Sequence, residues 1–489
     1  MKHPLSSQGG SVGIITASLA ALLTLSPLQA GQPAPTTTET SESWLSTWWN
    51  GKYASGNWFG VRDTLEEHGL KLGGKWTGDF YGVVDGGKAH VNGGFFDEEI
   101  KFTGQLDFAK ALNVDALEGL TGFGEVRWRD GRSVNNRVGA TSNFNPSHFQ
   151  SGLGWRLMNF GLTYSTPEMF GVKNFLTVTG GWINPQREFI DQPLSKQFVN
   201  NTFESSKGIG ATIPWSSSFA TWGGTLKIKP TEWSYIKGGL FMAYPQATSN
   251  NNHGLAFKGY DPDQGLNGLF GMFEAGVTPK IGPAELPGKY AFGSYVYGDW
   301  NNSFYGYRSL SHFGFYWQAD QMLYREPSPE VEVSGKGPSD GKAVASIVDG
   351  KASGGKSFKE PVSTEKPKLS DQGLYCFNLL TFGPSYNTVL PFYFQSGLVY
   401  KGLIPTRDQD QLMAAIGFGN YSFNNIEHLQ DDVGNVNQPN YTAVIELDYR
   451  VQINQFLYVQ PFFQYIVQPN GTGAIENASI LGAQASVAF

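Results

Sequence analysis

Two stretches of the chain match the spacing of phosphate-binding or catalytic motifs. Residues 350–357 read GKASGGKS, the glycine-rich spacing that cradles phosphate at the start of a helix. Residues 9–13 read GGSVG, the spacing of a nucleophilic serine on a sharp turn. The first lies in a low-complexity segment with Pro361 close behind, so no helix is expected to hold phosphate. The second lies in a leader-like N-terminus, and we therefore expect neither an enzyme nor a cofactor.

Metal, nucleic-acid and disulfide patterns are also missing from the sequence. None of the seven histidines is spaced as a metal-ligand pair such as H-x-x-x-H. The formal net charge is −7 and no basic tract indicates nucleic acid as a partner. The single cysteine, Cys376, excludes an internal disulfide framework. The chemistry-bearing residues that remain are charged side chains within strand-like runs.

These charged side chains recur at alternate positions. In residues 125–129 the three charged side chains share one face of a strand, while valine and tryptophan share the other. Residues 101–108 and 445–450 repeat this pattern. The runs are about ten residues long, which is the length of a strand in an outer-membrane barrel. A soluble sandwich gives the same alternation, so alternation alone leaves both folds open.

The number of runs and the lengths of their connections separate the two folds. About sixteen candidate strands are present, an even number as in bacterial single-chain barrels. The predicted strands are 71–84, 99–110, 121–133, 155–165, 174–183, 219–229, 232–243, 267–278, 288–299, 311–324, 373–383, 390–403, 411–423, 441–452, 455–467 and 479–489. Connections that follow even-numbered strands are mostly short, as at 230–231 and 453–454, whereas the intervening ones are mostly long. Barrels sort turns and loops in this way, and we predict an all-β, antiparallel outer-membrane barrel.

This barrel places the C-terminus and divides the chain. Phe489 is expected to end the last strand at the periplasm, where that strand pairs with the first strand near Lys71. Residues 1–30 are predicted to be a signal peptide, with an apolar stretch shorter than the ~20 residues of a spanning helix. Residues 31–70 are predicted to be a periplasmic segment with a short helix at 64–68, and residues 71–489 to be the barrel.

One connection departs from the rule of short periplasmic turns. Residues 326–370 form a low-complexity insertion that cannot bury enough apolar surface to fold alone. A tolerated disordered insertion is one interpretation, and a periplasmic contact with peptidoglycan is the other. A second long connection, 184–218, is expected to fold into the lumen, narrow the pore and set its selectivity. The alternative for 184–218 is an ordinary outer loop.

Strand parity then predicts which side chains line the pore. The predicted pore-lining and substrate-binding residues are Lys101, Asp107, Glu125, Arg127, Arg129, Arg187, Asp191, Asp320, Glu446 and Arg450, with Asp448 on the same face as the last two. Carboxylates accept hydrogen bonds from hydroxyl groups and arginine donates in pairs, so this set suits a neutral polyhydroxy solute. The alternative is that paired charges brace the barrel wall.

Several segments, taken in order, resemble a known family. They are residues 56–62 (GNWFGVR), 318–324 (QADQMLY), 397–402 (GLVYKG) and 460–466 (QPFFQYI). In these segments the chain resembles the carbohydrate-selective porins of the OprB type. The resemblance implies an outer-membrane barrel of about sixteen strands. It also implies passive diffusion of sugars, glucose in particular, through the barrel without a cofactor.

The hypothesis is therefore a multi-pass β-barrel porin in the outer membrane that facilitates the diffusion of glucose-type sugars. Its expected partners are sugars, outer-membrane lipid and the barrel-assembly machinery, and the sequence leaves a homotrimer and a monomer both open. A general diffusion porin, a wall-anchored structural barrel and a soluble glycan-binding β-protein are the alternatives.

Overall fold

The computed structural model describes residues 44–88, 93–150, 153–204, 219–243, 250–257, 268–297, 312–327, 369–424 and 438–489. The predicted signal peptide and most of the insertion 326–370 lie outside these residues, as does the GKASGGKS stretch. The chain divides after Thr47 into two units, and the second, Trp48–Phe489, contains the sheet. No helix among the described residues is long and apolar enough to cross a membrane.

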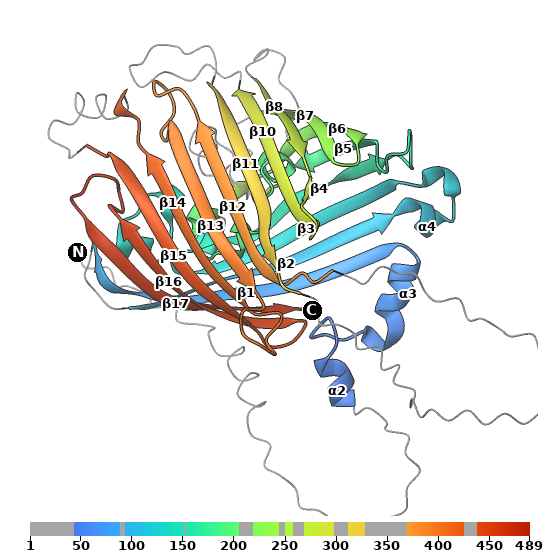
Figure 1. The fold of residues 1–489 in the computed structure, drawn as a ribbon, viewed down its shortest axis with the longest axis horizontal. Coiled ribbons are helices and arrows are strands. Elements are labelled where there is room, and N and C mark those ends of the chain that lie inside the picture. The colour runs from blue at the N-terminus through green and yellow to red at the C-terminus, as the bar shows by residue number, and fades with distance from the viewer. Residues whose placement is uncertain are drawn as a thin grey trace, which may run out of the picture. The chain divides into compact units, whose positions relative to one another are not determined.

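The sheet is a closed antiparallel barrel. It contains seventeen strands, one of which, β9 (Lys280–Ile281), is a two-residue strand folded back on the start of β10. The other sixteen pair with their neighbours in chain order, and Figure 1 shows them in colour order around the wall. They are β1 (Leu70–Gly87), β2 (Gly94–Asp107), β3 (Leu120–Gly131), β4 (Gly154–Ser165), β5 (Leu176–Ile183), β6 (Thr221–Thr231), β7 (Ser234–Met242), β8 (Leu269–Val277), β10 (Leu286–Tyr297), β11 (His312–Arg325), β12 (Gly373–Phe382), β13 (Phe392–Lys401), β14 (Gln411–Asn420), β15 (Tyr441–Gln452), β16 (Leu457–Val467) and β17 (Glu476–Ala488).

The C-terminal residue closes the barrel, as the sequence predicts. β17 pairs with β1 in a register that sets Ala488 opposite Lys75. Phe489 then exchanges two backbone hydrogen bonds of 2.9 Å with Gly74, and its ring lies where a Gly74 side chain would begin. Gly74 therefore makes room for the terminal aromatic ring, which also lies 5.9 Å from the ring of Phe102. We call this end of the barrel the Phe489 end.

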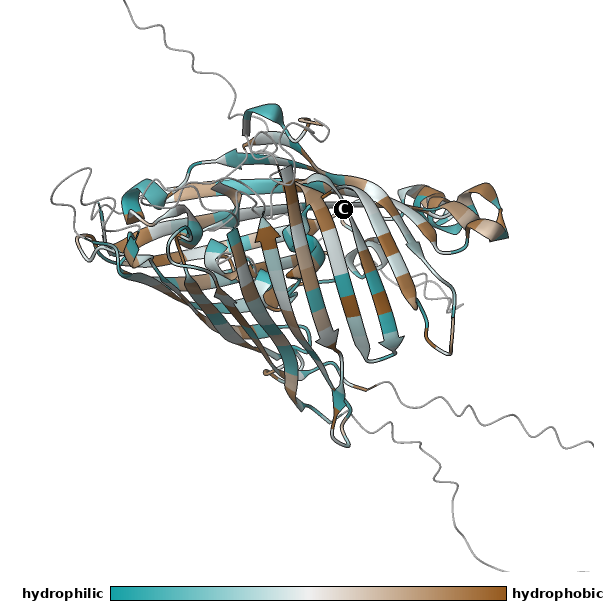
Figure 2. Cartoon of the chain, turned by 90° about the horizontal axis from the view of Figure 1, so that it is seen from above, coloured by the Kyte–Doolittle hydropathy of each residue, from teal (hydrophilic) through white to brown (hydrophobic). Residues whose placement is uncertain are grey.

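The strands alternate between an exposed apolar face and a buried face. On β11, Phe315 and Trp317 are exposed, whereas Tyr316 and Gln318 between and beside them are buried. Figure 2 shows the resulting alternation of hydrophobic and hydrophilic residues along the strands. Successive side chains of a strand point to opposite faces, so the exposed apolar set forms the outer wall and the buried polar set faces inward.

Short helices lie in the connections and before the barrel. At the Phe489 end are α4 (Phe108–Leu112) and η2 (Asp115–Leu117), between β2 and β3. The opposite end carries α5 (Asn135–Val138), η3 (Ser142–Phe144), η4 (His148–Gln150), α6 (Pro185–Phe189), η5 (Ser195–Gln197), η6 (Asn201–Phe203) and η8 (Asn250–Asn252). The segment before β1 forms α2 (Trp44–Trp49), η1 (Trp58–Gly60) and α3 (Val61–Glu67). The helix predicted at 64–68 thus begins three residues earlier, and α2 was not predicted.

Arg62 is one of the residues that hold α3 against the start of the barrel. Arg62 in α3 is buried, and its guanidinium carbon lies 3.8 Å and 4.2 Å from the ring centroids of Tyr53 and Trp58. It donates a hydrogen bond of 3.3 Å to the backbone oxygen of Leu72 at the start of β1. Stacking between two rings and bonding to a carbonyl are both tasks suited to a planar guanidinium, so arginine is required here.

Candidate permeation site

Residues 184–204, between β5 and β6, form a loop that lies along the inner wall of the barrel. The loop starts with a capped helix, in which the side chain of Asn184 accepts hydrogen bonds from the backbone nitrogens of Gln186 and Arg187, and Pro185 occupies the first helical position. The rest of the loop has little regular structure, so its position depends on bonds to the wall.

These bonds reach strands around much of the circumference. Glu188 forms an ion pair of 2.9 Å with Lys237 on β7, and the backbone oxygen of Phe189 accepts from Gln318 on β11. Further along, Gln192 donates to the backbone oxygen of Asn378 on β12, at 2.8 Å. Further links join Gln395 and Tyr393 on β13 to Gln192 and Thr202 of the loop. Arg450 on β15 and Gln460 on β16 both donate to the backbone oxygen of Gln197. The prediction that this connection folds into the lumen is confirmed for its described part.

A second connection, residues 132–150, packs against the first. Asn201 donates a backbone hydrogen bond of 2.9 Å to Asn145, and a ring nitrogen of His148 lies 2.9 Å from the backbone oxygen of Asn200. Gln464 on β16 donates to the backbone oxygen of Pro146, also at 2.9 Å. The two loops therefore form one inward-folded layer, which we call the loop layer.

Glycines on the inner wall leave space for the loop layer. A Cβ atom at Gly417 on β14 would lie 2.2 Å from the Thr202 methyl carbon, and one at Gly419 would lie 2.7 Å from the Phe144 ring. On the other side of the barrel, Gly239 on β7 would collide with the ring of Phe189. These glycines serve close packing, because any side chain there would displace a loop residue.

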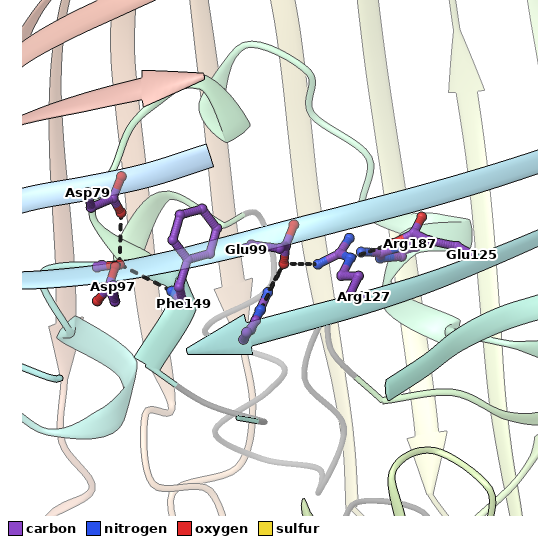
Figure 3. A network of polar contacts seen from close by, with 9 residues as sticks. Asp79, Asp97, Glu99, Glu125, Arg127, Phe149 and Arg187 are labelled. Atoms are coloured by element: carbon purple, nitrogen blue, oxygen red, sulfur yellow. Dashed lines mark hydrogen bonds and ion pairs between the residues drawn. The ribbon is translucent and has the colours of Figure 1, made fainter. Parts of the chain in front are cut away.

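The charged side chains at the β2–β3 wall form a continuous network with the loop (Figure 3). Glu99 on β2 accepts from Arg127 at 3.0 Å and from Arg129 at 2.7 Å, both on β3. Arg127 also pairs with Glu125 two residues away. Arg187 of α6 completes the network, with its Nη1 3.1 Å from each carboxylate oxygen of Glu125.

Access to this network differs along its length. The Arg187 side chain is 22% exposed, whereas those of Glu125 and Arg127 are 12% and 9% exposed. Arg187 therefore has the largest exposed fraction of the side chains in this ion-paired network. Charged donors and acceptors alternate along the network, which suits a solute whose hydroxyl groups can both donate and accept hydrogen bonds.

The structure places the other predicted residues in different settings. Lys101 on β2 lies directly opposite Arg127 in the strand register, beside the network. Asp320 on β11 lies opposite Lys289, and Asp191 of the loop forms an exposed ion pair of 2.6 Å with Lys196. Asp107 accepts from the backbone nitrogen of Lys110 and caps α4 at the Phe489 end. Lys101 alone of these lies beside the network.

Glu446, Asp448 and Arg450 lie beneath the loop layer. Both oxygens of Glu446 accept hydrogen bonds from loop backbone, at 2.7 Å from Val199 and 2.9 Å from Asn200, and the residue is fully buried. Arg450 donates to Gln197 of the same loop. The prediction that Glu446 lines the pore is corrected accordingly: Glu446 faces inward, but the loop covers it and separates it from the channel.

Sequence reasoning missed Glu99 and the amides that hold the loop. Glu99 shares the parity of Lys101, so extending the alternation of β2 by two residues would have found it. Gln192, Asn200 and Gln464 carry no such signal, since their partners are far away in the sequence. Within the described residues no group of histidine, cysteine and acidic side chains could hold a metal ion.

Comparison with known proteins decides the family. The sequence pattern of the carbohydrate-selective porins, OprB family, matches residues 97–489. The chain belongs to this family. It is similar to Porin B of Pseudomonas aeruginosa, with 26% identity across 90% of this chain and 92% of the relative.

Solved structures agree on the fold. The chain is similar to the high-pH structure of Pseudomonas putida OprB, with a TM-score of 0.72 and 20% identity over 90% of this chain and 99% of that one. The low-pH structure of the same protein gives a TM-score of 0.52 and 18% identity, with the same coverage. This OprB-family chain is an outer-membrane β-barrel porin for carbohydrates, and thus a transport channel.

Proposed function

We propose that glucose-type sugars diffuse through the barrel past a constriction between the loop 184–204 and the β2–β3 wall. The observation that carries this proposal is the bridge from Arg187 on the loop to Glu125 on the wall, which brings a loop charge and a strand charge together inside the lumen. In this proposal Lys101, Arg127 and Arg129 complete the sugar-facing set.

Alternating guanidinium and carboxylate groups would exchange hydrogen bonds with a sugar as it passes. Each contact is weak, and a series of weak contacts favours transport, because the solute must leave as readily as it enters. Asp191 and Asp320 form a second group that the same sugar would meet, near Lys289 and Lys196. No catalytic step and no cofactor belong to this function.

The proposed organisation combines strand parity with the leader-like composition of the N-terminus. Residues 1–30 are a signal peptide, 31–70 a periplasmic segment, and 71–489 the barrel with its insertion 326–370. The Phe489 end faces the periplasm, and the terminal strand is the one that the barrel-assembly machinery would recognise. Fractionation with peptidoglycan tests whether the insertion contacts the cell wall. Native mass measurement tests whether the porin assembles as a homotrimer or remains a monomer.

The direct test of the function is swelling of liposomes that contain the purified porin. Glucose should enter faster than an amino acid or a salt of similar size. Equal rates for all three solutes would reject sugar selectivity and would favour a general diffusion porin.

A further inference from the structure

Two pairs of acidic side chains lie under the loop layer, and among the described residues no ion pair joins either of them to a cation. The first pair is Asp79 on β1 and Asp97 on β2, which lie directly opposite each other in the strand register and are 0% and 1% exposed. The second pair is Glu446 and Asp448, two residues apart on β15, which are 0% and 3% exposed. Like charges at such positions repel each other, so a buried acidic pair needs an explanation.

For Asp79 and Asp97, the number of hydrogens available for bonding explains how two buried acidic side chains can lie side by side. Ser147 Oγ, in the loop 132–150, lies 2.9 Å from an oxygen of Asp79 and 2.8 Å from an oxygen of Asp97, and it accepts from the backbone nitrogen of Phe149. A serine hydroxyl has a single hydrogen to donate. It can bond one carboxylate as donor, so the other carboxyl group must itself donate a hydrogen to Ser147.

The outer oxygens of this pair are also occupied. Gln484 on β17 donates to Asp79 at 2.8 Å, and the Tyr81 hydroxyl donates to Asp97. The other charged groups that face the pair are Glu99 on β2 and Arg129 on β3, and these two are paired with each other. The shared proton therefore has to sit between the two aspartates and Ser147.

The second pair repeats this arrangement under the other loop. Both oxygens of Glu446 accept from Val199 and Asn200, so Glu446 has the bonds of an ionised carboxylate. Asp448 accepts from Gln460 with one oxygen, while its other oxygen is buried and has no hydrogen-bond partner. A proton on that oxygen, directed at Glu446, would satisfy it, and Arg450 is the charged group that faces the pair.

We infer that these two pairs are positioning residues, which fix the loop layer on the wall only while each pair holds one shared proton. Removing the proton leaves two like charges and one bond too few at each pair. The two loops are joined through Asn145, Asn201, His148 and Asn200, so they are expected to loosen together. The ring nitrogen of His148 can donate to the Asn200 oxygen whether the imidazole is neutral or charged.

Hydrogen exchange of the backbone amides of residues 196–202 tests this inference on the folded porin. Between pH 5 and pH 9, after correction for the intrinsic rate, protection of these amides should fall about tenfold or more, which is the effect of losing one charged hydrogen bond. The double variant Asp97→Asn and Asp448→Asn should keep its protection, because each amide supplies a permanent donor. Asp408→Asn, in an exposed turn, is the matched control and should behave as the parent.

The outcomes are separable. Unchanged protection of the parent across this pH range would overturn the inference, and so would an equal loss in the double variant. If the double variant does not fold, the pH profile of the parent still decides. The inference about loop position does not need the proposed function, but its effect on transport does. If the loops loosen and ion conductance does not rise, the proposed constriction is rejected, while the inference of proton-sharing pairs still stands.

Discussion

Replacing Arg187 by glutamine should change the ion preference of the channel. Arg187 is part of a network in which three guanidinium groups, Arg127, Arg129 and Arg187, oppose two carboxylates, Glu99 and Glu125. The substitution removes the excess positive charge at the most accessible point. It also breaks two hydrogen bonds of 3.1 Å to Glu125, of a kind that contributes about 1.5–3 kcal/mol.

The size of the effect follows from Coulomb's law in a water-filled channel. A unit charge about 5 Å from a passing ion is worth about 0.8 kcal/mol, or about fourfold for each sign of ion. Salt screening reduces this, so the permeability ratio of anions to cations should fall roughly threefold to tenfold in Arg187→Gln.

Reversal potentials in planar bilayers under a potassium chloride gradient measure this ratio. The matched control is Arg407→Gln, whose guanidinium pairs with Asp410 in the turn between β13 and β14. The control should retain the selectivity of the parent. An unchanged ratio in Arg187→Gln, or an equal shift in both variants, would refute the placement of Arg187 at the constriction.

Two further changes test the packing of the loop and the turns. Gly417→Ala should displace the loop at Thr202, lower the free energy of unfolding by about 1–3 kcal/mol and speed proteolysis of that loop. Gly238→Ala, whose added methyl group would lie in open space, should have none of these effects. Equal proteolysis of the two variants would contradict the contact between Gly417 and Thr202. Burial alone would raise the pKa of Asp410, but hydrogen bonds, first from Arg407, hold it below its usual value. Asp410 therefore stabilises the folded porin at pH values above its unfolded-state pKa, and this stability is lost as the pH falls through its folded-state pKa. Asp410→Asn should lower the stability against urea at pH 7 and should match the parent near pH 2.

The barrel could be predicted from the sequence because apolar and polar residues alternate within each strand and so mark its outer and inner faces. Alternation in β15 and the closing position of Phe489 are local signals, and both are confirmed by the structure. The structure moves some strand ends from their predicted positions. The second strand was predicted at 99–110, but Asp107 caps α4 and ends β2 at that residue, which moves the strand toward the N-terminus.

The interior could be predicted only in part. Parity gives the direction in which a side chain points, and it correctly directs Glu125 and Glu446 inward. It cannot tell that one of them meets Arg187 and that the other is covered by loop backbone, because those partners lie far away along the chain. Amide side chains such as Gln192 give no periodic signal in a loop, so the bonds that position the loop need the three-dimensional structure.

The central claim is that sugar binds weakly between the loop 184–204 and the β2–β3 wall, within the path of ions. Single-channel ion current recorded while glucose is added measures this directly. The account predicts a current that falls along a saturating curve, with weaker saturation in Arg187→Gln. A current that falls only in proportion to the viscosity of the solution, in parent and variant alike, would contradict it.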